Sequence, residues 1–228
     1  EAETSYTSIR IPVGDMGAQE IINLLNMLHA KQYLINKAIG QEGFSVSDSL
    51  ITDLEAGTFQ DAGEVIDFIG SHEGSNAGFA FLEDTILFTG FPYTEEPGAV
   101  RAYTVLASKM VQSAGMQKRI SPKPTVEENE KYYMRSWMVR IGLGGKDTKE
   151  ERTFLLSGLK GHTAFRTPAD EEKWKANRKA ARAAAKEAAG ETAEETAEEA
   201  AEETTETAAE ETAEEIAQIG RASWRERV

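Results

Sequence analysis

The residues of this sequence that could bind a ligand are basic, and they gather between residues 101 and 166. That segment contains 13 Lys and Arg against 6 Asp and Glu, a net charge of +7. Clustered basic side chains bind phosphate groups or acidic protein surfaces. The candidate binding residues are Lys118, Arg119, Lys131, Arg135, Arg140, Lys149 and Arg152. They predict contact with nucleic acid or with a partner protein.

The same segment holds a glycine-rich stretch, residues 142–148 (GLGGKDT), that superficially suggests a phosphate-binding loop. Such a loop needs glycine five residues before its Gly-Lys pair and Ser or Thr directly after the Lys. Arg140 and Asp147 occupy those two positions, so we interpret the stretch as a turn that stops a helix. A helix pair joined by this turn, with exposed Lys and Arg, is compatible with helix-turn-helix docking on DNA.

The sequence offers no recognisable constellation for catalysis or metal binding. His29, His72 and His162 have no spacing typical of metal ligands or of a catalytic base, and His29 is expected near a helix end. The chain has no cysteine, which excludes thiolate ligands, cysteine nucleophiles and disulfides. No catalytic residue, metal site or cofactor is predicted. An enzyme without an identifiable motif is the alternative function.

Charge is distributed unevenly along the chain. The net charge is -14, and residues 1–100 contain 3 Lys and Arg against 16 Asp and Glu. The basic segment therefore has a second interpretation, as the internal complement of the acidic segment. The absence of cysteine fits a reducing compartment, and no apolar run approaches the roughly 20 residues of a membrane span. A cytoplasmic protein that does not contact membranes is expected.

Hydrophobic periodicity predicts the elements that position these residues. Alternation over residues 5–13 predicts a strand, residues 44–47 a short strand, and residues 78–82 with 85–89 a β-hairpin. Helical spacing predicts a helix from residue 16 to about residue 28, a short helix over 33–39 closed by Gly40, and helices within 49–73. These elements predict an α+β fold, with a small, mainly antiparallel sheet and helices in the N-terminal half.

Residues 98–166 are predicted to be helical. A first helix spans about 98–116, residues 121–124 form a linker, Thr125 and Glu128 form a capping box for a second helix, and Asp147 caps a third. The predicted divisions are an α+β half (5–97), a three-helix half (98–166), a basic Ala-rich helix (167–190) and a solvated acidic low-complexity tail (191–218). Residues 219–228 (IGRASWRERV) resemble the translation of a sequencing-adapter oligonucleotide and are set aside.

Several short runs carry a family resemblance over about residues 8–166. They are residues 9–13 (IRIPV), 34–40 (LINKAIG), 88–92 (FTGFP), 117–121 (QKRIS), 129–142 (NEKYYMRSWMVRIG), 156–159 (LSGL) and 164–166 (AFR). The chain resembles an uncharacterised family carried on conjugative and other mobile elements of gut Gram-positive bacteria, whose members are labelled virulence-related proteins. It departs from that family at residues 144–145 and at His162.

The resemblance implies a bacterial cytoplasm and an accessory gene of a mobile element, and it implies no established activity. Together with the basic segment, it leads to one expected function. The protein is expected to be a non-enzymatic mobile-element accessory protein that binds a partner protein or nucleic acid through its basic helical half.

Overall fold

The computed structural model describes residues 6–189, except residues 73, 75, 83, 125 and 127. Its elements are β1 (Tyr6–Pro12), α1 (Ala18–Ile39), β2 (Ser45–Val46), α2 (Asp48–Ala56), α3 (Ala62–Ser71), β3 (Asn76–Ala77), β4 (Phe79–Leu82), β5 (Thr85–Pro92), α4 (Pro97–Met116), α5 (Glu130–Met138), a π-helical turn (Val139–Leu143), a 3-10 turn (Lys146–Thr148), α6 (Lys149–Leu156) and α7 (Pro168–Ala189). Small antiparallel sheets lie among helices in the N-terminal part, and the described elements from Pro97 onward are helical. The predicted α+β fold is confirmed.

Internal contacts divide the chain into two compact units. The first contains Glu1–Glu127 and Trp137–Leu159, and the second contains Glu128–Ser136 and Lys160–Val228. Helix α5 crosses the boundary, so residues 130–136 belong to the second unit and the end of the helix to the first. The two units are described separately below.

The sheet of the first unit is built around β5. Strands β1 and β4 both pair with it in antiparallel fashion, in the order β1-β5-β4, while β2 and β3 form a separate pair. The predicted hairpin is confirmed, because Phe79 lies opposite Phe88 and Leu82 opposite Thr85. Along β5, Ile86 and Phe88 are buried, and the residues that alternate with them, Thr85, Leu87 and Thr89, are half-buried, as expected when helices cover one face.

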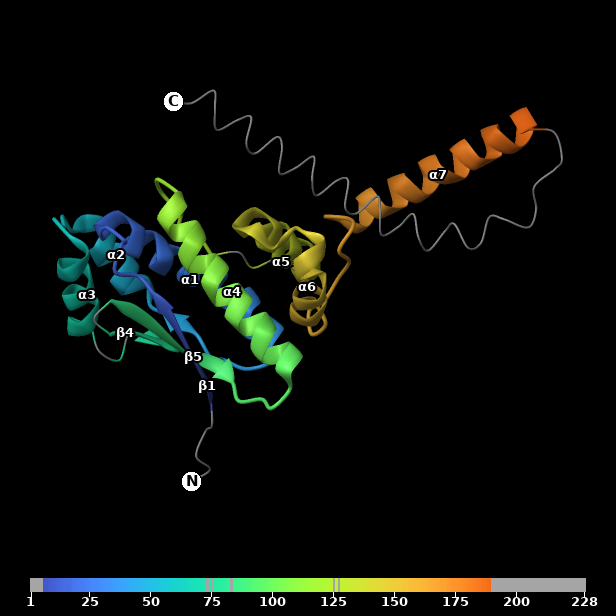
Figure 1. Ribbon diagram of the computed structural model, residues 1–228. Helices are drawn as coiled ribbons and strands as arrows, with labels where there is room; N and C mark the ends of the chain where they lie inside the picture. The colour runs from blue at the N-terminus through green and yellow to red at the C-terminus, as the bar shows by residue number, and fades with distance from the viewer. Residues whose placement is uncertain are drawn as a thin grey trace. The chain divides into compact units, whose positions relative to one another are not determined.

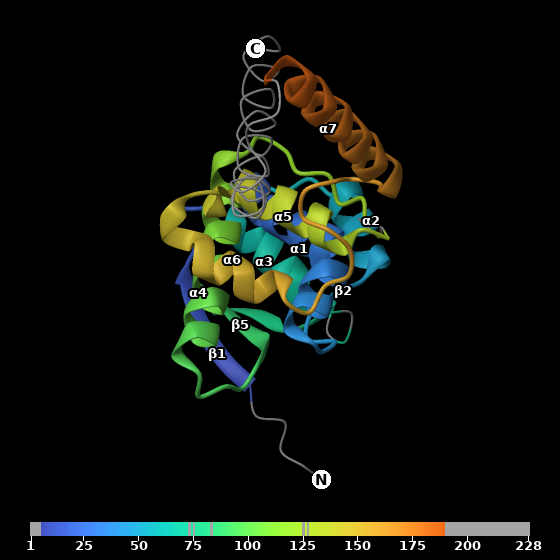
Figure 2. The ribbon, with the colours of Figure 1, turned by 90° about the vertical axis from the view of Figure 1, so that its right-hand side faces the viewer.

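Helices α1 and α4 lie together on this sheet (Figures 1 and 2). Aromatic rings join the layers. Phe91 of β5 stacks on Tyr103 of α4 with ring centroids 4.9 Å apart, and it meets Phe44 edge to face at 4.9 Å. Rings in these arrangements contribute about 0.5–1.5 kcal/mol each beyond the area that they bury.

Helix α1 is a single helix of 22 residues. The prediction of two helices, the second over 33–39, is wrong, because no glycine or proline interrupts residues 29–32 and the apolar face continues through Leu34 and Ile35. The predicted stop at Gly40 is correct. Gly40 has a φ of 74° in the left-handed region, and its N–H donates to the carbonyls of Asn36 and Lys37.

The starts of the last helices differ from the predicted caps. Helix α5 begins at Glu130, where the side chain of Asn129 accepts a hydrogen bond from the Tyr132 N–H at 3.2 Å. The predicted capping residue Thr125 lies outside the described residues. Asp147 does not cap α6, because it lies inside the 3-10 turn that precedes the helix.

Candidate functional site

A row of buried polar side chains on α1 fixes the path of the linker after α4. We use this name for residues 117–123. Asn23 and Asn26 lie three residues apart on the helix, and both are buried. The Asn23 amide donates to the Gln117 carbonyl at 2.6 Å, and its side-chain oxygen accepts from the Ile120 N–H at 2.9 Å. Asn26 donates to the Ile120 carbonyl at 3.0 Å. Because buried polar groups are costly to leave unpaired, these bonds hold the linker in one conformation.

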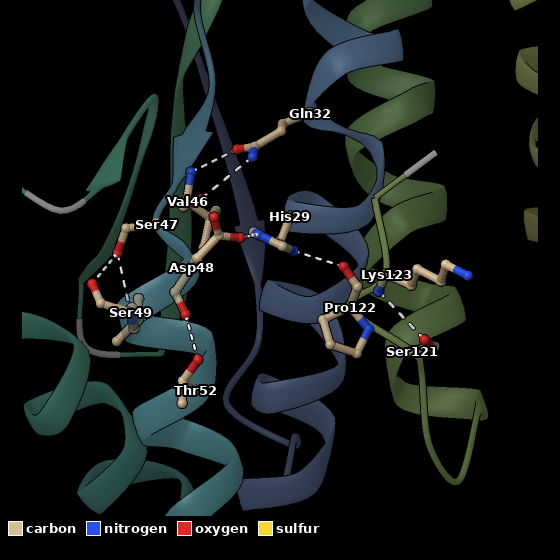
Figure 3. Close-up of polar contacts among 11 residues, drawn as sticks. His29, Gln32, Val46, Ser47, Asp48, Ser49, Thr52, Ser121, Pro122 and Lys123 are labelled. Atoms are coloured by element: carbon tan, nitrogen blue, oxygen red, sulfur yellow. Dashed lines mark hydrogen bonds and ion pairs between the residues drawn. The ribbon is translucent and has the colours of Figure 1, made fainter. Parts of the chain in front are cut away.

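His29 continues the row one turn further along α1. The residue is only 4% exposed and lies within the helix, so the expectation of a helix-end position is wrong. Nδ1 lies 2.6 Å from the Pro122 carbonyl oxygen, and Nε2 lies 2.8 Å from Oδ1 of Asp48 at the start of α2 (Figure 3). The two ring nitrogens thus contact an oxygen of the linker and an oxygen of α2. His29 thereby joins the linker to α2.

The held linker forms one wall of a pocket of about 300 Å³. The other walls are α1 and the segment from Trp137 to Ile141, and all of them belong to the first unit. The pocket's side chains are of three kinds: the cations Lys31, Arg119, Lys123 and Arg140, the neutral donors Gln117 and Ser121, and the apolar Met27, Ala30, Ile120, Trp137 and Ile141. Among the described lining residues none is an Asp or a Glu. We call this feature the cationic pocket.

The pKa of Lys31 reflects both the burial and the positive charge of the cationic pocket. Burial of its ammonium group, and secondarily the nearby charge of Arg140, lower its pKa from 10.5 to about 8. Both effects disfavour the charged amine. An anion bound in the pocket would reverse the second effect and compensate part of the first. The pocket is therefore suited to a ligand that carries negative charge.

The seven candidate residues from the sequence lie in different places. Arg119 and Arg140 line the cationic pocket, and Lys118 is exposed on the same linker without lining the pocket. Lys131 and Arg135 are half-buried on the part of α5 that belongs to the second unit. The structure therefore brings two of these five residues into one site.

The last two candidates are on α6. Lys149 is exposed in its first turn, whereas Arg152 is buried. The Arg152 guanidinium donates to the carbonyls of Leu143 at 2.6 Å and Gly145 at 2.7 Å, which holds the glycine turn. This structural role removes Arg152 from the proposed binding surface.

Helix α6 also lacks the face expected of a recognition helix. Glu151 is buried, and its carboxylate lies 2.6 Å from the Arg101 guanidinium of α4, so α6 packs against α4 (Figure 2). The exposed residues of its first turn include Glu150 beside Lys149. An acidic residue at that position would repel a phosphate backbone.

Two cations of the pocket, Lys31 and Lys123, are absent from the seven candidates, and of these only Lys31 lies outside the basic segment. Lys31 is one of three basic residues in the acidic part of the chain, and it lies 88 residues or more from the other cations of the pocket. A signal was present in Asn23, Asn26 and His29, because polar residues three apart on an apolar helix face indicate a buried partner strand or loop. The sequence did not show which segment that partner was.

Comparisons of the chain with protein-family models, with curated proteins and with solved structures gave no match. Among the residues that the structure describes, no helix is long and apolar enough to cross a bilayer. Within the same residues, no three His, Asp or Glu side chains gather in a way that could hold a metal ion. The functional argument therefore depends on the cationic pocket.

Proposed function

We propose that this protein is a nucleic-acid-binding module that holds backbone phosphate in its cationic pocket. The observation that carries the proposal is the convergence of four cations, from α1, the linker and the segment after α5, around one concave site. The role of accessory protein of a mobile element, implied by the sequence resemblance, is part of the same proposal.

The chemistry of the lining favours phosphate over a protein carboxylate. A phosphate group offers several acceptor oxygens, and guanidinium groups such as those of Arg119 and Arg140 bind it with paired hydrogen bonds. Ser121 and Gln117 add neutral donors, which are typical of contacts to the sugar-phosphate backbone. The pocket of about 300 Å³ is lined by four cations, which is more positive charge than a single carboxylate would neutralise.

Fluorescence anisotropy of a labelled DNA duplex, and of a single strand, with the whole chain tests the proposal. Two to four phosphate contacts predict that log K falls with log salt with a slope of about -2 to -3.5, because bound counterions are released. Poly-glutamate of equal charge serves as the competitor. Absence of binding at low salt, or displacement of the DNA by poly-glutamate at equal charge, would overturn the proposal, the latter in favour of an acidic protein partner.

Binding is also expected to depend on pH through Lys31. Since its pKa is about 8, the amine is mostly charged at pH 7 and mostly neutral at pH 9. Loss of this cation should weaken nucleic-acid binding about threefold to tenfold between those pH values. The same anisotropy titration of a Lys31→Arg variant, which stays charged, should be flat over this range. An equal pH dependence in both proteins would assign it to another group.

A further inference from the structure

Lys31 combines two properties that make an amine reactive. It is half-buried on α1, beside the apolar side chains of Met27, Ala30 and Trp137. It also lies near the positive charge of Arg140. Removal of water and a neighbouring cation are the conditions under which lysine acts as a nucleophile at neutral pH.

The lowered pKa greatly increases the fraction of Lys31 that is unprotonated, and therefore nucleophilic, at pH 7. An ordinary lysine is unprotonated in roughly one molecule in several thousand at pH 7, whereas a lysine with a pKa of about 8 is unprotonated in roughly one in ten. The other cations of the pocket would hold the anionic part of a ligand beside this amine. A reactive amine next to an anion site defines the ligand as an anionic electrophile.

We propose that Lys31 forms a reversible Schiff base with an aldehyde that carries a phosphate group, while Arg119, Lys123 and Arg140 hold the phosphate. This inference rests on the phosphate-binding pocket of the proposed function and adds a covalent step to it. It also names a reactive residue, Lys31, for the alternative that the protein is an enzyme.

The step balances without any oxidant or reductant. The lone pair of the Lys31 amine attacks the carbonyl carbon, a C–N bond forms, and the carbonyl electron pair moves to the oxygen, which takes up one of the two protons of the attacking nitrogen. The resulting carbinolamine loses the remaining nitrogen proton and the hydroxyl group as water, which leaves the imine. Hydrolysis reverses the sequence and restores both partners.

Two sources supply an aldehyde that carries a phosphate group. One is a small phosphorylated aldehyde, and the other is an abasic site in nucleic acid, whose sugar opens to an aldehyde between two phosphates. Both sources would form the same Schiff base with Lys31, so the test needs one probe for each source. Pyridoxal 5′-phosphate represents the first, and an oligonucleotide with one abasic site represents the second.

The experiment traps the imine in the whole chain with sodium borohydride and locates the modified lysine by peptide mass spectrometry. Pyridoxal 5′-phosphate should modify Lys31 at least tenfold faster than the exposed Lys37 of the same helix. Pyridoxal without the phosphate should lose most of that preference. The abasic oligonucleotide should give a borohydride-dependent covalent complex that Lys31→Arg abolishes and Lys37→Arg retains.

The outcomes separate this inference from the proposed function. If the original chain binds intact DNA and is trapped at Lys31, while the Lys31→Arg variant is no longer trapped and Lys37→Arg still is, both stand. If intact DNA does not bind but pyridoxal 5′-phosphate marks Lys31 with phosphate dependence, the Schiff base stands with a small-molecule source and the nucleic-acid proposal falls. Modification spread evenly over the exposed lysines, or equal reaction with pyridoxal, overturns the inference.

Discussion

Replacing Gly78 with alanine is expected to lower the free energy of unfolding by more than about 3 kcal/mol. Gly78 has a φ of 88°, a conformation that strains any residue with a Cβ. An added Cβ would overlap the carbonyl oxygen of Gly43 and press on the ring of Phe44. The Gly78 carbonyl also accepts hydrogen bonds from the N–H groups of Thr89 at 2.7 Å and Gly90 at 2.9 Å. The turn has no room to shift without losing these bonds.

Urea denaturation followed by circular dichroism measures this effect, with Gly115→Ala as the matched control. Gly115 lies in α4, and no atom would come within 4 Å of an added Cβ there. Alanine is the better helix former by roughly 1 kcal/mol, so the control is expected to be neutral or more stable than the original chain. Equal stability of the Gly78→Ala and Gly115→Ala variants would contradict the packing described for this turn.

Reversing both arginines of the cationic pocket, as Arg119→Glu with Arg140→Glu, is expected to weaken nucleic-acid binding at least about 100-fold. Each change removes one cation and adds one anion within the same concave site. Both side chains are exposed, so the fold should tolerate the changes. The 3.5 Å contact of Arg119 with Glu55 is an exposed ion pair, which contributes little to stability.

The matched control reverses two exposed lysines of α7, as Lys173→Glu with Lys179→Glu, and changes the net charge of the protein by the same amount. Anisotropy at one fixed salt concentration compares the two double variants. If the pocket is the binding site, the affinity of the α7 variant for nucleic acid should fall less than about fivefold, because only the overall electrostatic field of the protein changes. Equal losses in both variants would show that binding follows net charge rather than the pocket.

Local signals in the sequence were sufficient for the sheet and for several helix ends. The hairpin of β4 and β5 followed from two β-rich runs around a two-residue turn, and the end of α1 followed from Gly40. Helix α4 was predicted within one residue of its observed start, Pro97. Such features depend on neighbours in the chain, which periodicity and turn chemistry capture.

The features that the sequence did not predict depend on contacts between distant segments. The buried polar side chains of Asn23, Asn26 and His29 on α1 find their hydrogen-bond partners in the linker, about 90 residues later in the chain. Lys31 likewise belongs to a site whose other cations lie in the basic segment. No one-dimensional pattern connects such positions, so the seven candidate residues contained only half of the pocket's four cations.

The candidate residue Arg152 shows a related difficulty. Its neighbours in sequence are charged, which favours an exposed helix face, yet it is buried and its guanidinium binds backbone carbonyls. A glycine turn leaves carbonyl groups without partners, and a nearby arginine can supply the donors. The choice between that role and ligand binding depends on the path of the turn.

Hydrogen–deuterium exchange of the whole chain, with and without a saturating oligonucleotide, tests the central claim most directly. It measures the backbone of every segment at once and does not depend on a substitution. The cationic pocket predicts slower exchange in the linker, residues 117–123, and in the segment 137–141, with smaller changes elsewhere. Slower exchange confined to α7, with the linker unchanged, would contradict the assignment of binding to the cationic pocket.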